Sequence, residues 1–178
     1  YVGLTQDQHK MYQQIKEHAM VVLGDMDFVT APMVITQLLR LQQVLCGHLK
    51  TDDGHTVTFP SKRMDALLEV IEEHDGKAII WSRFRHDIQQ IVENLNKVHG
   101  EGCAAAYYGD TSDDERQRIV EDFQKPHSRL KYFVGNPATA GYGITLTEAN
   151  LVVYYANDFN LETRIQSEDR AHRIGQKN

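Results

Sequence analysis

The first third of the chain has hydrophobic residues at helical spacing, followed by a short stretch with a period of two. Apolar positions three and four residues apart predict helices within 4–23 and 31–48. Thr5 and Gln8 have the spacing of a capping box at the start of the first helix. Behind the Asp-Gly pair at 53–54, apolar residues alternate with threonines, which is typical of a hairpin.

From residue 60 onward, short apolar runs alternate with helical patterns. This alternation predicts an α/β fold, in which a parallel sheet is covered by helices on both faces. The order of the strands cannot be derived from the pattern. The expected helices are 61–74, 85–100, 113–124 and 161–175, and the expected strands are 77–82, 103–109, 130–136 and 151–158.

The carboxyl ends of the expected strands are the natural place for a ligand, because parallel sheets of this kind bind ligands there. The segments beyond those ends are 82–84, 108–112, 135–143 and 157–160, and all four carry polar residues or glycines. The candidate chemistry is therefore expected at one edge of the sheet.

Composition is that of an ordinary soluble globular protein, with 41% hydrophobic and 25% charged residues among 178. No apolar run is long enough to cross a bilayer and the start has no signal-peptide pattern, so no membrane partner is expected. Cys46 and Cys103 are the only cysteines, which favours reduced thiols in a cytosolic protein. Cys46 and His48 lack a second ligand pair, so no metal site is expected.

The net charge of -6 argues against a surface that attracts nucleic acid as a whole. The segment 164–178 is different, with four basic residues and two acidic ones. Contact with phosphate requires only such a local basic patch.

Three residues near the end of the chain have the spacing of one helix face: Gln166, Arg170 and Arg173. We expect Ile165 to turn toward the core from the same helix. Two guanidinium groups on neighbouring turns repel each other unless an anion lies between them, so a phosphate site is one interpretation. The other is ordinary surface ion pairs with the nearby acidic residues, Glu162, Glu168 and Asp169.

Gly141 and Gly143 follow the third expected strand and would let the backbone approach a ligand closely. An ordinary turn is the alternative.

The sequence contains no G-x-x-x-x-G-K-[ST] phosphate loop, and no D-E-A-D-like acidic box follows a strand. Thr111 and Ser112 offer hydroxyls at a strand end and a helix start, where they suit either a backbone phosphate or simple helix capping with Glu115.

Taken together, these segments resemble the second RecA-like lobe of the Swi/Snf family of helicase-like, DNA-translocating ATPases. "QSEDRAHRIGQ" is similar to the family's motif VI, "AGYGITLTEANLVVYY" to motif V and "KAIIWSRF" to motif IV. "YYGDTSDDERQRIVEDF" resembles the segment between motifs IV and V, and "LTQDQHKMY", "LLRLQQVLCGH" and "PSKRMDALLEVI" resemble the stretches before the lobe. The resemblance covers nearly the whole chain.

The resemblance implies roles for individual residues. Arg170 and Arg173 match the motif VI arginines that reach ATP on the first lobe as arginine fingers. Gln166, Gly141 and Gly143 match residues on the nucleotide side of the cleft. The implied DNA-backbone contacts are Ser82, Arg83, Thr111, Ser112, Asn136 and Thr139.

Several positions depart from the family pattern, and they bear on the implied DNA contacts more than on the arginine fingers. They suggest a divergent branch, with a phage or mobile element as one origin. The departing residues are Arg83, Ala138, Ala140, Thr145, Ala156, Phe159 and Leu161.

The resemblance further implies that 60–178 is the second motor lobe, cut just after motif VI, and that 1–59 is a helical and hairpin segment before it. ATP and Mg²⁺ would be held mainly by a first lobe. The expected partners are that first lobe and double-stranded DNA, and no oligomer is expected. The location would be the cytoplasm of a bacterium or phage host, or a nucleus. Half of an RNA helicase and a non-catalytic RecA-like scaffold are the alternatives.

Overall fold

The computed structural model describes residues 2–24, 31–140 and 143–171. The chain divides into two compact units, Tyr1–Ala66 and Leu67–Asn178. None of the helices among the described residues is both long and apolar enough to cross a bilayer.

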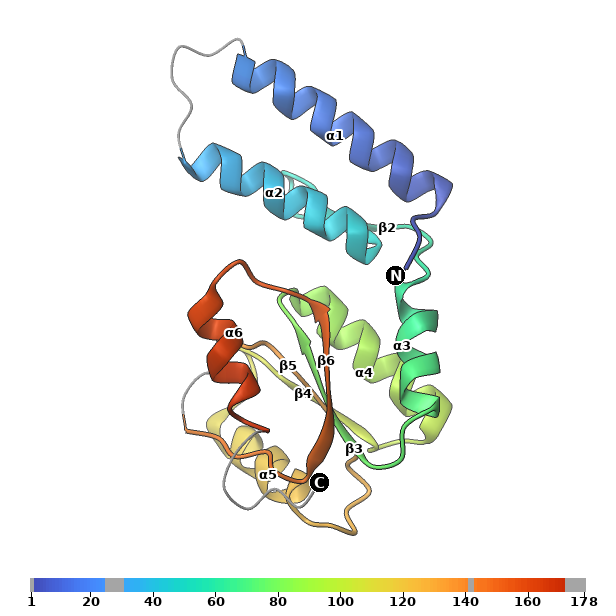
Figure 1. Cartoon of the computed structure of the whole chain (residues 1–178), viewed down its shortest axis with the longest axis vertical. Coiled ribbons are helices and arrows are strands. Elements are labelled where there is room, and N and C mark those ends of the chain that lie inside the picture. Colours follow the sequence, from blue (N-terminus) through green and yellow to red (C-terminus); the bar gives the residue numbers. More distant parts are fainter. Residues whose placement is uncertain (1, 25–30, 141–142, 172–178) are drawn as a thin grey trace. The chain divides into compact units, whose positions relative to one another are not determined.

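The first unit contains two helices that lie side by side and a small hairpin (Figure 1). The predicted capping box is confirmed, because the Gln8 amide donates to Thr5 Oγ1 at 3.3 Å and Gln8 Oε1 accepts from the Thr5 amide at 3.0 Å. The buried Gln8 Nε2 also donates to the Val44 carbonyl at 3.0 Å, which joins the two helices. The elements are α1 (Gln6–Gly24), α2 (Ala31–Cys46), and the antiparallel strands β1 (His48–Lys50) and β2 (Thr56–Thr58).

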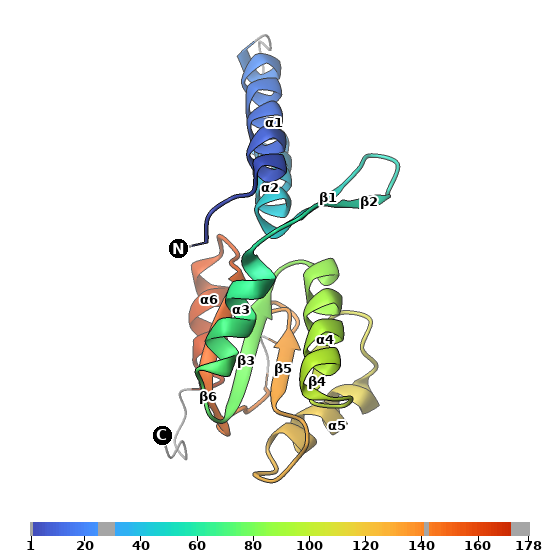
Figure 2. The ribbon, with the colours of Figure 1, turned by 90° about the vertical axis from the view of Figure 1, so that its right-hand side faces the viewer.

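The second unit is a four-stranded parallel sheet with the order β4-β5-β3-β6, which confirms the predicted α/β fold. Helices α3 and α4 lie on one face of the sheet, and α5 and α6 lie on the other (Figures 1 and 2). The strands are β3 (Lys77–Ser82), β4 (Ala104–Tyr107), β5 (Tyr132–Gly135) and β6 (Ala149–Ala156), and the helices are α3 (Arg63–Glu72), α4 (Arg85–His99), α5 (Asp113–Phe123) and α6 (Leu161–Glu168).

The core on the α5 side of the sheet is aromatic. Phe133 is fully buried, and its ring centroid lies 5.1 Å from that of Tyr107, 5.7 Å from Trp81 and 5.8 Å from Phe123. These rings come from β5, β4, β3 and α5, so a single cluster fixes three strands and a helix. Aromatic pairs at these separations add to the stability that comes from their buried area.

A buried lysine at the start of β3 is explained by the end of α5. Lys77 Nζ donates to the carbonyl of Phe123 at 2.5 Å and to that of Lys125 at 2.7 Å. The last carbonyls of a helix have no partner within the helix, so Lys77 supplies one. Burial lowers the pKa of Lys77 from its usual value, with Glu148 and Asp122 opposing the shift.

Candidate functional site at the carboxyl ends of the strands

The segments that follow the four strands lie along one edge of the sheet, which we call the carboxyl edge. It consists of 82–85 after β3, 108–112 after β4, 135–140 after β5 and 157–160 after β6. Because β5 lies between β4 and β3, segments that are far apart in the sequence become neighbours in space.

Asn136 connects three of these segments. Its Nδ2 donates to the Arg83 carbonyl at 2.9 Å, and its own amide donates to the Tyr107 carbonyl at 3.0 Å. Its Oδ1 accepts from the Ala138 amide at 2.9 Å. Asn136 therefore joins the ends of three strands: its half-buried side chain bonds to the β3 end and to its own turn after β5, and its backbone amide bonds to the β4 end. Thr139, also half-buried, lies in the turn that Asn136 begins and donates its amide to the Asn136 carbonyl at 3.1 Å.

Two of the expected DNA contacts have hydroxyls that are already used inside the protein. Ser82 is fully buried; its Oγ donates to Asp87 Oδ2 at 2.9 Å and accepts from the Phe84 amide at 3.3 Å. Thr111 is 8% exposed; its Oγ1 accepts from the Tyr108 amide at 3.1 Å and donates to the Ala106 carbonyl at 3.3 Å. These hydroxyls shape the loops after β3 and β4.

Ser112 is exposed and caps α5. Its Oγ accepts from the Glu115 amide at 3.3 Å, which confirms the predicted capping role. The same helix start carries Asp113 and Asp114 in its first turn, where negative charge is favourable.

Two ion pairs cross between segments of the carboxyl edge. Arg83 Nη1 lies 3.4 Å from Asp158 Oδ1, joining the end of β3 to the end of β6. Arg85 Nη1 lies 2.5 Å from Asp110 Oδ2, joining the start of α4 to the loop after β4. The arginines of this edge thus have carboxylate partners from distant segments. Sequence reasoning did not single out Arg85; its signal was a cation at the first position of a helix, where the helix dipole disfavours positive charge.

The helix predicted for 161–175 is shorter than expected. It ends at Glu168, and Arg170 lies in the following turn, so the expectation that Gln166 and Arg170 share a helical face is wrong. Beyond Glu168 the chain turns, with the Ala171 amide donating to the Glu168 carbonyl at 3.1 Å, and the Arg170 carbonyl accepts a hydrogen bond from the Leu146 amide at 3.1 Å.

Arg170 is 6% exposed, so it is a buried residue. Its Nη1 donates to the Ile144 carbonyl at 3.4 Å. Arg170 therefore attaches the motif VI segment to the motif V segment through both its backbone and its side chain.

The other expected nucleotide-side residues have different surroundings. Gln166 is half-buried, and its Nε2 donates to Glu162 Oε1 at 3.0 Å. Ile165 is 49% exposed, so the expectation that it turns to the core is wrong. Gly143 is exposed with φ +82°, and a Cβ there would meet nothing within 4 Å. Arg173 and Gly141 lie outside the described residues.

Helix α6 is attached to β6 by a tyrosine. Tyr154 Oη lies 2.6 Å from Ser167 Oγ, and the Arg164 guanidinium lies 3.3 Å from the centre of the Tyr154 ring. Burial raises the pKa of Tyr154, and the hydrogen bond with Ser167 partly opposes that shift. The phenol stays protonated at neutral pH and fixes the helix that leads to Arg170.

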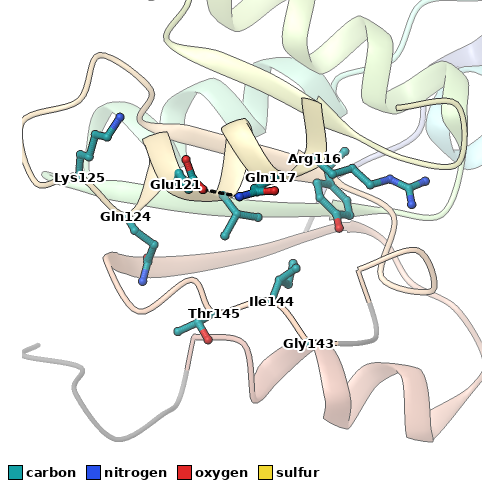
Figure 3. A pocket seen from close by; sticks show the side chains of 10 residues that line it. Arg116, Gln117, Glu121, Gln124, Lys125, Gly143, Ile144 and Thr145 are labelled. Atoms are coloured by element: carbon teal, nitrogen blue, oxygen red, sulfur yellow. Dashed lines mark hydrogen bonds between the residues drawn. The ribbon is translucent and has the colours of Figure 1, made fainter. Parts of the chain in front are cut away.

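A pocket of about 690 Å³ lies between α5 and the segment 143–145 (Figure 3). Its inner wall includes Ile144, the residue whose carbonyl accepts from Arg170. The lining residues are Tyr107, Arg116, Gln117, Val120, Glu121, Gln124, Lys125, Gly143, Ile144 and Thr145.

The departures from the family pattern lie both inside the protein and on its surface. Ala140 is 1% exposed, in the turn that Asn136 begins. Phe159 and Leu161 are 68% and 71% exposed, at and just beyond the end of the carboxyl edge.

The parallel sheet and the joined motif V and VI segments define a RecA-like lobe of the helicase type. The helicase conserved C-terminal domain family matches residues 62–175, and the chain belongs to this family. The chain is homologous to SWI/SNF and ISWI ATPases.

Two curated relatives illustrate the match. The human SWI/SNF-related matrix-associated actin-dependent regulator of chromatin subfamily A member 1 is 29% identical over 191 residues, which are 99% of this chain and 18% of the human protein. The Saccharomyces cerevisiae ISWI chromatin-remodeling complex ATPase ISW1 is 29% identical over 197 residues, covering 99% of this chain and 17% of the yeast protein. This chain thus spans less than a fifth of the length of either relative.

Solved structures give the same assignment. The Sulfolobus solfataricus SWI2/SNF2 ATPase core in complex with dsDNA matches with a TM-score of 0.78 at 28% identity, covering 100% of this chain and 38% of that one. The C-terminal domain of the Sulfolobus ATPase matches with a TM-score of 0.69 at 28% identity, covering 87% of this chain and 69% of that one. These relatives are eukaryotic and archaeal, so they give no support to a phage origin.

Proposed function

We propose that this chain is the second motor lobe of an ATP-driven DNA translocase. In that role it supplies arginine to ATP bound on a first lobe and grips the DNA backbone at its carboxyl edge. The observation that carries the proposal is the attachment of motif VI to motif V by Arg170, in a chain of the helicase C-terminal family. A change at the nucleotide can thereby reach the segment after β5.

The two motif VI arginines would have different roles. The buried Arg170 donates to the Ile144 carbonyl, which fits a positioning role. We assign the arginine-finger role to Arg173, whose charge would stabilise the phosphoryl group during transfer. Gly143, with its positive φ and open surroundings, fits a backbone that comes close to the nucleotide. Mg²⁺ would be held by the first lobe.

The DNA side rests on the carboxyl edge. One structural relative is described as an ATPase core in complex with dsDNA, which supports the same ligand here. The exposed Ser112 and the half-buried Thr139 would contact the DNA directly, whereas the buried Ser82 and Thr111 would act by shaping the loops. Contacts of this kind read the phosphate backbone and not the bases, as a motor that steps along any sequence requires.

We expect the chain 1–178 by itself to show no DNA-stimulated ATP hydrolysis, because its sequence lacks the phosphate loop and the acidic box. Phosphate release with and without duplex DNA measures this. The positive control is the longer protein that includes a first lobe. Turnover by the chain alone, abolished by Arg173→Ala, would refute the division of the site between two lobes.

In the protein with both lobes, Asn136→Ala should weaken duplex binding by about tenfold, because the Arg83 carbonyl and the Ala138 amide lose their side-chain partner and the segments after β3 and β5 are no longer joined by it. The loss should be similar on unrelated DNA sequences. Fluorescence anisotropy with several duplexes measures it. Asn94→Ala on α4 is a matched control, since the half-buried Asn94 donates to the Gln90 carbonyl of its own helix. A loss confined to one sequence would contradict backbone recognition.

A further inference from the structure

Arg85 is an exposed arginine at a position where a helix disfavours positive charge. It is the first residue of α4, and the amino end of a helix carries a partial positive charge. Its side chain is 59% exposed, so burial does not account for its place. An anion that binds both the guanidinium group and the amino end of the helix would offset the repulsion between these two positive charges.

That anion is at present a carboxylate of the protein. Asp110 Oδ2 lies 2.5 Å from Arg85 Nη1, and the Asp110 side chain is 57% exposed. Asp110 belongs to the loop after β4, so the pair crosses the carboxyl edge above the end of β5. The carboxylate oxygen stands where a phosphate oxygen would bind the same guanidinium.

An aromatic ring also lies near the Arg85 guanidinium. The Arg85 guanidinium lies 5.3 Å from the centre of the Tyr108 ring, and Gln89 Nε2 donates to Tyr108 Oη at 3.2 Å. Gln89 lies one helical turn after Arg85, so α4 positions both the arginine and the ring that supports it.

The second ion pair of the carboxyl edge, Arg83–Asp158, is less exposed than the Arg85–Asp110 pair. In the Arg83–Asp158 pair the side chains are 24% and 29% exposed, against 59% and 57% in the Arg85–Asp110 pair. An exposed pair contributes at most about 1 kcal/mol, whereas an arginine binds phosphate through two strong, parallel hydrogen bonds. Exchange of partners is therefore favourable at Arg85 and opposed by burial at Arg83.

We propose that Arg85 is a phosphate-binding residue of the carboxyl edge and that Asp110 is its exchangeable counter-ion, displaced by a backbone phosphate of DNA. This inference rests on the proposed function and adds to it a residue pair that sets the affinity of the carboxyl edge for DNA. Asp110 masks the arginine in the free protein and lowers the affinity for DNA. A motor that must release and rebind DNA at each step has a use for such a competitor.

The test is a double-mutant cycle of Arg85→Ala and Asp110→Asn in the protein with both lobes, with duplex affinity measured over a range of salt concentrations. Asp110→Asn should raise the affinity about two- to fivefold, the value of an exposed ion pair. Arg85→Ala should lower the affinity and reduce the slope of log K against log salt by about 0.9, as expected for one phosphate contact. Removal of a cation from the first turn of α4 is not expected to unfold it.

The double-mutant cycle distinguishes displacement of Asp110 from Arg85 by a DNA phosphate from simple repulsion between Asp110 and DNA. If Asp110 acts by masking Arg85, Asp110→Asn should have little effect once Arg85 is alanine. An equal gain in both backgrounds, or an equal gain from Asp114→Asn at the exposed start of α5, would overturn the proposal. An unchanged salt slope in Arg85→Ala would also overturn the proposal about Arg85. If Asn136→Ala still weakened duplex binding in that case, the proposed DNA-binding function of the carboxyl edge would stand. Absence of duplex binding by the unmodified protein would overturn both.

Discussion

Replacement of Arg173 by alanine should lower kcat for DNA-stimulated ATP hydrolysis by about 10³ or more in the protein with both lobes. The physical reason is that a finger arginine offsets negative charge that develops on the phosphoryl oxygens during transfer. In a site that excludes water, no solvent dipole replaces it. Steady-state phosphate release at saturating ATP and DNA gives kcat, and nucleotide affinity is measured separately.

The matched control for this substitution is Arg118→Ala, because Arg118 is an exposed arginine on the outer surface of α5. We expect its kcat to stay within about twofold of the unmodified value, since surface substitutions seldom change stability by more than about 0.5 kcal/mol. A raised KM for ATP with an unchanged kcat in Arg173→Ala would show ground-state binding and would rule out the finger role.

Replacement of Phe133 by alanine should lower the free energy of unfolding by about 3–5 kcal/mol. Phe133 is fully buried, and its ring touches aromatic neighbours from two other strands and from α5. The cavity left behind cannot close easily, because the central strand β3 has every residue buried and pairs on both sides. Urea denaturation of the chain, followed by far-UV circular dichroism, measures the change.

Val98→Ala on α4 is the control for this loss. Val98 is 52% exposed, so its truncation should change the free energy of unfolding by no more than about 0.5 kcal/mol. A loss below about 1 kcal/mol in Phe133→Ala would show that the aromatic cluster is not what fixes β3, β4 and β5 together. It would also weaken the view that this core positions the carboxyl edge.

The sequence by itself determined the kinds of element, the fold class and the family. Apolar runs such as 77–82 suit strands that are buried on both faces, as in a covered parallel sheet, and the helical patterns between them provide the cover. The capping residues Thr5 and Ser112 were readable for the same reason, because a cap depends on residues three apart. Each of these signals is local in the chain.

Only the tertiary structure decided the strand order, the end of the last helix and the use of the polar side chains. The order β4-β5-β3-β6 arises from pairing between distant segments, which no periodicity records. The pattern of 161–175 reads as one helix, yet a hydrogen bond from Leu146 to the Arg170 carbonyl accompanies its end at Glu168.

The same holds for the polar residues of the edge. Ser82 reads as a DNA contact in the sequence, but the fold buries it against Asp87. Arg85 and Asp110 are 25 positions apart and become an ion pair only because β5 brings their loops together. Periodicity and capping are local and can be read from the sequence, whereas partners and burial depend on which distant segments the fold brings into contact.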